Sequence, residues 1–188
     1  MKKINTMKNL STILFLIILS VSLSSCLTVE KKVYTFELKD SNSGTLTVKY
    51  INILSMKDDT TDISDTDFEE LISGYIEGGQ IEEDYADAVV RSKRLFEEDG
   101  VLCGEVIIDF KNLRSVGLFQ YDNKSPFMFN IGSFLESETF LNSNGEYGGD
   151  IMPVVFWPKS FKTFNLTTYV TSPDETTISL LENYKSRK

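Results

Sequence analysis

The sequence predicts a strand-rich α+β domain, built as an antiparallel β-sandwich or a strongly curved sheet with one amphipathic helix. Short segments of alternating apolar and polar residues recur along the chain, and turn residues separate most of them, which is typical of antiparallel strands. The stretch 66–77 instead has helical periodicity. With 188 residues, 41% of them hydrophobic, and only 4 Pro, the chain has the composition of a single globular domain.

The first predicted element is a β-hairpin. Residues 33–38 (VYTFEL) and 45–54 (TLTVKYINIL) alternate and are rich in β-branched and aromatic side chains, which favours strands. The small polar residues 40–44 between them suit a turn. The acidic stretch 57–67 has no apolar periodicity, so we interpret it as a loop.

The predicted helix over 66–77 has a start, an apolar face and an end. Thr66 can cap it, with Glu69 three residues later as the partner in a capping box. Gly78 and Gly79 suit its end. The apolar side chains that fall on one face are Phe68, Leu71, Ile72, Tyr75 and Ile76.

Residues 85–98 fit either one face of a helix or one face of a strand, and the turn that follows favours the strand. Residues 98–100 (EDG) suit a three-residue hairpin loop with its glycine in the left-handed region. A helix would instead place the acids 97–99 at the negative end of its dipole. The expected hairpin register pairs Phe96 with Leu102, Lys93 with Glu105 and Val90 with Ile108.

The second half of the chain continues with strand-like segments and irregular stretches. The expected strands are 115–121, 126–131, 151–157 and 161–171. Residues 136–150 are interpreted as the least regular part of the domain, because Asn, Ser and Gly crowd there. The segment 172–175 (SPDE) can begin a short C-terminal helix, with Ile178, Leu181 and Tyr184 on its inner face.

The first 26 residues have the layout of a secretory signal. Lysines precede an apolar run over 13–19, and small residues then lead to Cys26. This run is far shorter than the ~20 residues that a membrane-spanning helix needs. The tetrapeptide Leu23-Ser24-Ser25-Cys26 resembles the lipobox of bacterial lipoproteins. The alternative is an ordinary cleaved signal with a chance cysteine.

The lipobox resemblance implies cleavage before Cys26 and acylation of this residue, which would attach the protein to a membrane without a transmembrane helix. It divides the chain into a signal peptide (1–25), a short tether (26–32) and a single β-rich domain (33–188). Leu27 stands where inner-membrane lipoproteins of the enteric type carry aspartate. The resemblance therefore implies the periplasmic face of the outer membrane, with the cell surface as the alternative.

Composition argues against several classes of function. The formal net charge of −9 offers no basic surface of the kind that nucleic acids require. The chain has no histidine, which excludes Ser-His-Asp and Cys-His catalysis and zinc sites with histidine ligands. Cys103 lies within a predicted strand, where we expect a buried, inert thiol. We therefore expect a non-catalytic protein without a cofactor.

Two segments carry candidate binding residues. The Gly-rich loop 142–150 is the expected contact region for a partner, and its candidate residues are Asn142, Asn144, Tyr147 and Asp150. The acidic loop offers carboxylates to Ca²⁺, and the candidate ligands there are Asp58, Asp62 and Asp65. Ile63 stands where an EF-hand loop needs glycine, so we favour a solvated loop and expect no metal.

Two hypotheses for the function remain open at this point. The first is a membrane-anchored domain that binds another envelope component, either a protein or a glycan. The second is a carrier or sensor that holds an apolar ligand inside a curved sheet, and a Ca²⁺-stabilised domain ranks third. Periodicity does not separate the first two, because a packed core and the lining of a cavity have the same apolar pattern. The oligomeric state is not predicted.

Overall fold

The computed structural model describes residues 26–57, 61–132 and 138–187. The predicted signal peptide over 1–25 and the candidate ligand Asp58 lie outside these described residues. The chain forms two antiparallel sheets and a few short helices, as predicted for a strand-rich α+β sandwich. No helix in the described part of the chain has the length and apolar character needed to cross a membrane.

The large sheet has seven strands in the order β3-β4-β2-β1-β10-β7, and β11 pairs with β2 outside this path. Its strands are β1 (Leu27–Leu38), β2 (Gly44–Met56), β3 (Val89–Glu98), β4 (Val101–Phe110), β7 (Thr139–Ser143), β10 (Thr163–Tyr169) and β11 (Thr177–Ser179). The small sheet has the order β5-β6-β9-β8. Its strands are β5 (Leu118–Gln120), β6 (Phe127–Asn130), β8 (Glu146–Tyr147) and β9 (Val154–Trp157).

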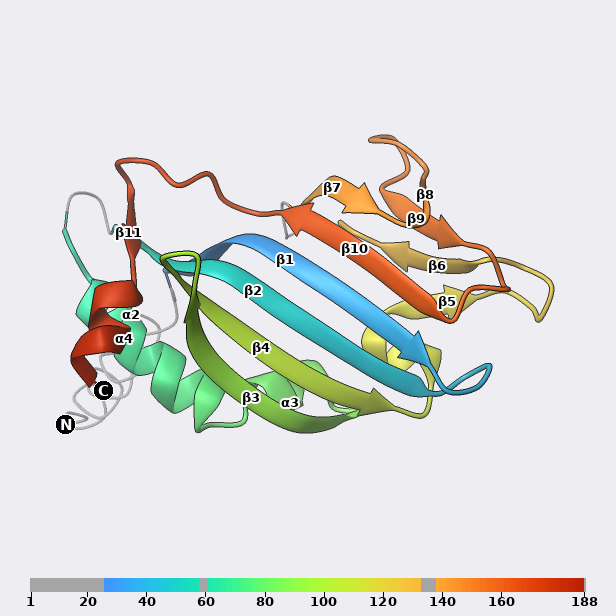
Figure 1. The fold of residues 1–188 in the computed structure, drawn as a ribbon, viewed down its shortest axis with the longest axis horizontal. Helices are drawn as coiled ribbons and strands as arrows, with labels where there is room; N and C mark the ends of the chain where they lie inside the picture. Colours follow the sequence, from blue (N-terminus) through green and yellow to red (C-terminus); the bar gives the residue numbers. More distant parts are fainter. Residues whose placement is uncertain (1–25, 58–60, 133–137, 188) are drawn as a thin grey trace, which may run out of the picture.

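In the part of the chain that the structure describes, five helical segments connect and cover the sheets. They are α2 (Ser64–Glu70), the π-helix η1 (Leu71–Ile76), α3 (Gln80–Asp84), the 3₁₀ helix η2 (Leu113–Val116) and α4 (Leu181–Arg187). Figure 1 shows the long strands β1, β2, β4 and β10 side by side, with α2 and α4 at one end and the small sheet at the other.

This arrangement gives the inner face of the large sheet two hydrophobic cores. The small sheet covers the first core, where the rings of Phe36, Trp157 and Phe164 pack against one another. The helices α2, η1 and α4 cover the second core, around Ile53 and Leu102. The interior of the sandwich is thus filled by aromatic side chains.

The prediction of a tether over 26–32 is wrong for all but its first residue. Residues 27–32 form the first half of β1, in which Leu27 pairs with Ser55 of β2. The backbone carbonyl of Cys26 already accepts a hydrogen bond from the Met56 amide at 2.8 Å. Within this segment, Lys32 has a buried partner in Glu138.

The hairpin β3–β4 confirms the strand interpretation of 85–98 only from Val89 onward, because residues 85–88 form a turn before β3, and the hairpin turn itself is shorter than expected. Glu98 remains in β3 and pairs with Val101, so the loop has two residues, Asp99 and Gly100, both with positive φ. The register near the turn is therefore displaced by one residue. It pairs Phe96 with Cys103, Lys93 with Val106 and Arg94 with Glu105. A bulge between Val90 and Ser92 restores the predicted pairing of Val90 with Ile108.

The predicted helix over 66–77 is present, with a different beginning. It starts at Ser64, whose backbone amide donates to Asp62 Oδ1 at 2.9 Å. Thr66 lies inside the helix and does not cap it. The helix continues from Glu70 directly into η1, so 64–76 is one helical segment that ends before Gly78.

Three expectations for the second half of the chain need correction. The first residues of the expected strand 115–121 belong to η2, and β5 is shorter. The stretch 136–150 contains β7 and β8, which form by pairing with β10 and β9. The expected helix start at 172–175 is followed instead by β11, because the β-branched pair Thr176 and Thr177 favours a strand, and α4 begins only at Leu181.

Candidate functional site

A cavity of about 330 Å³ lies between the inner face of the large sheet and the helical segment η1–α3. It is partly open to solvent and falls between the two hydrophobic cores. The sheet contributes Tyr50, Ile53 and Val106 to its wall, and the helical segment contributes Leu71, Tyr75 and Ile81. Its volume lies within the range of about 300–1,000 Å³ that is typical of small-molecule sites.

The cavity exists because the helical segment bridges two cores that do not merge. Ile81 of α3 packs on the first core and Leu71 of η1 on the second, while Tyr50 and Tyr75 pack against both. The lining includes Gly104 of β4, where a Cβ atom would lie 3.3 Å from Ile53 Cδ1. A mid-strand glycine thus leaves room beside the sheet.

One wall of the cavity is formed by the π-helix η1, and π-helices are often found at functional sites. η1 contributes Leu71, Tyr75 and Ile76 to the lining. Its C-terminal end is held by Lys93 of β3, whose ammonium group donates to the Gly78 carbonyl at 2.6 Å. The segment that covers the cavity is therefore fastened to the edge of the sheet.

Tyr50 is the polar group of the cavity best placed to meet a ligand. Burial raises the pKa of its hydroxyl well above the ordinary value, so the group stays protonated at physiological pH. This hydroxyl makes no hydrogen bond with any residue that the structure describes. It can therefore donate to an acceptor on a bound molecule without breaking an existing interaction.

The cations that line the cavity are all neutralised by carboxylates. Lys32 pairs with Glu138, Lys93 with Glu82 and Arg94 with Glu105, at 2.6, 2.9 and 2.8 Å respectively. These groups frame an apolar interior with a few hydrogen-bonding positions. The arrangement suits an amphipathic molecule without a strong net charge, since a charged ligand would have to compete with these pairs.

Glu138 is the most buried of these carboxylates, with a side chain only 4% exposed. Besides Lys32, it accepts hydrogen bonds from the Thr168 hydroxyl at 2.7 Å and from the Tyr34 hydroxyl at 3.1 Å. Burial raises the pKa of Tyr34, and the neighbouring Glu138 charge adds to the effect. The network joins β1, β10 and the start of β7 beside the cavity.

The predicted contact loop 142–150 is partly used by the fold itself. Asn144 Oδ1 accepts hydrogen bonds from Trp157 Nε1 and from the Asn165 amide, both at 2.8 Å, which makes Asn144 a structural residue. The ring of Tyr147 stacks on Phe140, with centroids 4.2 Å apart.

The two other predicted contact residues lie on the surface. Asn142 is an exposed residue of β7, and Asp150 is exposed beside Tyr147, whose hydroxyl donates to it at 3.3 Å. The structure therefore brings Tyr147 and Asp150 together and leaves Asn142 exposed on β7.

The acidic loop does not gather its described carboxylates. Asp62 accepts from the Ser64 amide at the start of α2, and Asp65 accepts from the Asn183 side chain of α4 at 2.7 Å. Asp67 points into the protein and accepts from Ser55. Among residues 26–57, 61–132 and 138–187, no group of three metal-ligating side chains is close enough to hold an ion.

Sequence reasoning did not identify the cavity residues, because Tyr50, Tyr75 and Ile81 follow the same apolar pattern as core residues. Gly104, in the middle of a strand, is the one signal that could have pointed to it. Comparisons of the chain with protein-family models, curated proteins and solved structures found no match.

Proposed function

We propose that the protein is a lipid-anchored, non-catalytic binding protein of the bacterial envelope, and that its domain receives a small amphipathic molecule in the cavity between the large sheet and η1–α3. The observation that carries this proposal is the cavity itself, with its apolar wall and a Tyr50 hydroxyl that makes no hydrogen bond with any described residue. It favours the ligand hypothesis over partner binding through 142–150, because Asn144 and Tyr147 are engaged within the fold.

The chemistry of the wall defines the class of ligand. Aliphatic side chains and two tyrosines provide most of the lining, so a ligand must bury apolar surface to bind there. Tyr50 supplies a hydrogen-bond donor for one polar group. A short-chain alcohol, ester or monoglyceride-like molecule combines these two features.

Anchoring at Cys26 is supported by the lipobox resemblance of residues 23–26. Because β1 begins at Leu27, an acylated Cys26 would place the start of the large sheet directly at the membrane. The periplasmic face of the outer membrane is the proposed location, and the cell surface is the alternative.

The absence of catalysis is proposed from the chemistry available at the site. The chain has no histidine to transfer protons near neutral pH. The lysines beside the cavity, Lys32 and Lys93, are both engaged in ion pairs with carboxylates.

The proposal is tested by titrating the protein with the uncharged fluorophore N-phenyl-1-naphthylamine. We expect one probe to bind per folded chain, with displacement by a monoglyceride. Ile76→Trp should weaken probe binding at least tenfold, because Ile76 lines the cavity and the larger ring fills it. Ser73→Trp is the matched control: it adds the same ring to an exposed position of η1 and should bind like the natural chain.

Circular dichroism establishes that both variants are folded before the titration is interpreted. Equal probe binding by Ile76→Trp and Ser73→Trp would contradict the proposal, as would a natural chain that binds no probe. Loss of binding in Ile76→Trp alone would support it.

A further inference from the structure

The end of the large sheet opposite Cys26 gathers exposed cations from three different strand ends. Lys39 follows the last residue of β1, Lys111 follows the last residue of β4, and Lys162 precedes β10. The register brings these ends together, because Gly44 pairs with both Leu38 and Phe110. The Leu38 amide also donates to the Lys162 carbonyl at 2.8 Å.

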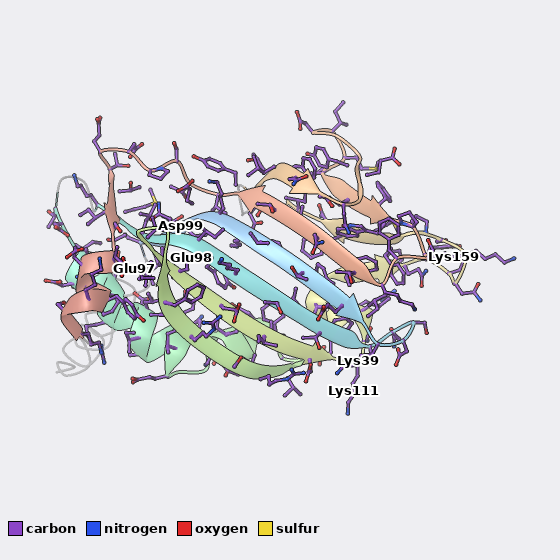
Figure 2. All side chains as sticks on the ribbon, in the orientation of Figure 1. Lys39, Glu97, Glu98, Asp99, Lys111 and Lys159 are labelled. Atoms are coloured by element: carbon purple, nitrogen blue, oxygen red, sulfur yellow. The ribbon has the colours of Figure 1, made fainter. Side chains whose placement is uncertain are left out.

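Neighbouring turns add further cations to this end. We call the set the basic end, and it consists of Lys39, Lys111, Arg114, Lys124, Lys159 and Lys162, all of which are exposed. Figure 2 shows Lys39, Lys111 and Lys159 toward one end of the molecule, and the acidic turn residues Glu97, Glu98 and Asp99 toward the other. The molecule is therefore electrically polar along its strands, although its net charge is negative.

The cations of the basic end differ from most other cations of the surface in having few carboxylate partners. Elsewhere, the described cations other than Lys57, which donates to the Glu175 carbonyl, are held by carboxylates: the basic members of these pairs are Lys31, Lys32, Lys49, Arg91, Lys93, Arg94, Lys185 and Arg187. At the basic end, Lys39 makes a single long contact of 3.9 Å with Asp109. The other members of the basic end make no ion pair with any described residue.

Two of the acids near the basic end, Asp40 and Asp122, are occupied by their own turns, while Glu37 and Glu146 are exposed carboxylates at the same end. Asp40 accepts from the Ser43 hydroxyl and from the Asn42 amide, and these bonds lower its pKa. Asp122 is held in the same way by Ser125 and the Lys124 amide. These carboxylates close turns, and the lysines beside them remain available to an external anion.

A shallow depression beside these lysines offers apolar contact as well. Pro126, Phe156, Pro158 and Phe161 contribute to its lining. Three of these residues are close neighbours in the chain of Lys124, Lys159 and Lys162. Apolar surface next to cations suits a polymer of sugar rings that carries negative groups better than it suits a free inorganic ion.

We infer that the basic end is a docking surface for a carboxylate-bearing glycan polymer of the cell wall, with peptidoglycan as the chemical type. Cations spread over several turns match many weak contacts along a repeating polyanion, whose combined effect exceeds that of each contact. Charge complementarity also speeds association with such a polymer.

The position of the basic end favours a polymer over a lipid surface. β1 has 12 residues and spans about 40 Å from Cys26 to Lys39. This step rests on the anchoring at Cys26 that belongs to the proposed function. With Cys26 in a membrane, the basic end points away from that membrane and toward the wall.

The test is co-sedimentation of the full-length lipidated protein, kept in neutral detergent, with isolated peptidoglycan. The natural chain should sediment, and its binding should fall as salt is raised. The variant K111Q/K124Q/K159Q/K162Q should bind at least tenfold more weakly. The matched control K31Q/K57Q/K185Q/R187Q has the same change in net charge away from the basic end and should sediment like the natural chain.

Equal sedimentation of the two variants would overturn the inference, as would a natural chain that stays in the supernatant. Binding of the non-acylated Cys26→Ala chain to vesicles of phosphatidylglycerol and phosphatidylcholine, in place of binding to peptidoglycan, would also overturn it, in favour of a lipid surface. Sedimentation with peptidoglycan does not depend on the cavity. A protein that sediments but does not bind the fluorophore would contradict the proposed ligand site and would still support docking at the basic end.

Discussion

The ammonium group of Lys93 in β3 donates to the Gly78 carbonyl at 2.6 Å and to the Glu82 carboxylate at 2.9 Å. One side chain of the sheet thereby fixes the junction between η1 and α3, the two segments that cover the cavity. With its side chain only 11% exposed, Lys93 makes these contacts in a partly desolvated setting.

Replacing Lys93 with methionine should loosen the cover of the cavity. We expect the free energy of unfolding to fall by about 1–2 kcal/mol, since a charged hydrogen-bond donor is lost, and fluorophore affinity to fall several-fold. Urea unfolding and probe titration measure the two effects. Lys49→Met is the control, because it removes an ion pair with Glu98 away from η1 and α3. Equal loss of affinity in both variants would contradict this role of Lys93.

Replacing Glu138 with alanine should destabilise the domain more strongly. The change leaves Lys32 without its carboxylate and the hydroxyl groups of Tyr34 and Thr168 without their acceptor. Removing one member of a buried ionic network is costly, so we expect a loss of about 2–4 kcal/mol in urea unfolding. Glu37→Ala, at an exposed position of β1, should change stability by less than about 0.5 kcal/mol. A comparable cost at both positions would rule out a special role for Glu138.

Two glycines provide a test of the β3–β4 turn. Gly100 has φ of 79°, and a Cβ atom there would meet nothing within 4 Å. Gly100→Ala should therefore cost about 1–2 kcal/mol through backbone strain alone. Gly79 has equally open surroundings but φ of −103°, so Gly79→Ala should be nearly neutral. Thermal unfolding of both variants checks the prediction, and equal costs would argue against the two-residue turn.

Acid should destabilise the domain through aspartates held in turns and ion pairs. The Ser43 hydroxyl lowers the pKa of Asp40, the Ser125 hydroxyl that of Asp122, and Arg91 that of Asp109. A pKa that is lower in the folded state stabilises the protein above the ordinary value of about 3.9 and ceases to do so as the pH falls. Urea unfolding should therefore show stability declining below about pH 4. The double variant D40N/D122N should decline less steeply, and a profile identical to that of the natural chain would refute this cause.

The main architecture could be predicted from the sequence wherever the apolar pattern of a segment matches the burial of that segment in the fold. Alternation over 33–38 and 45–54 indicates the central hairpin, and the apolar spacing of 66–77 indicates the helix. The strand over 89–98 follows from turn chemistry. These signals are local, because each depends on residues that are neighbours in the chain.

The features that were missed depend on partners distant in sequence. Residues 27–32 resemble a tether in the sequence, because the partner of Lys32 is Glu138, which lies more than one hundred positions away. The strands β7 and β8 form in a Gly-rich stretch because β10 and β9 offer free edges. The hairpin register also depends on a bulge next to Val90, which spacing alone does not reveal.

The candidate site was out of reach for a related reason. The side chains of Tyr50 and Tyr75 face inward, as core side chains do. They line a cavity because the two hydrophobic cores do not merge. Of the predicted contact residues, Asn144 resembles a surface amide in sequence, whereas its side chain bonds Trp157 in the structure.

Native mass spectrometry of the protein, exported and purified without refolding, tests the central claim most directly. We expect an additional mass per chain that is lost on denaturation, is missing from Ile76→Trp and is retained by Ser73→Trp. The bare mass of the chain in all three proteins would contradict a ligand in the cavity between the large sheet and η1–α3.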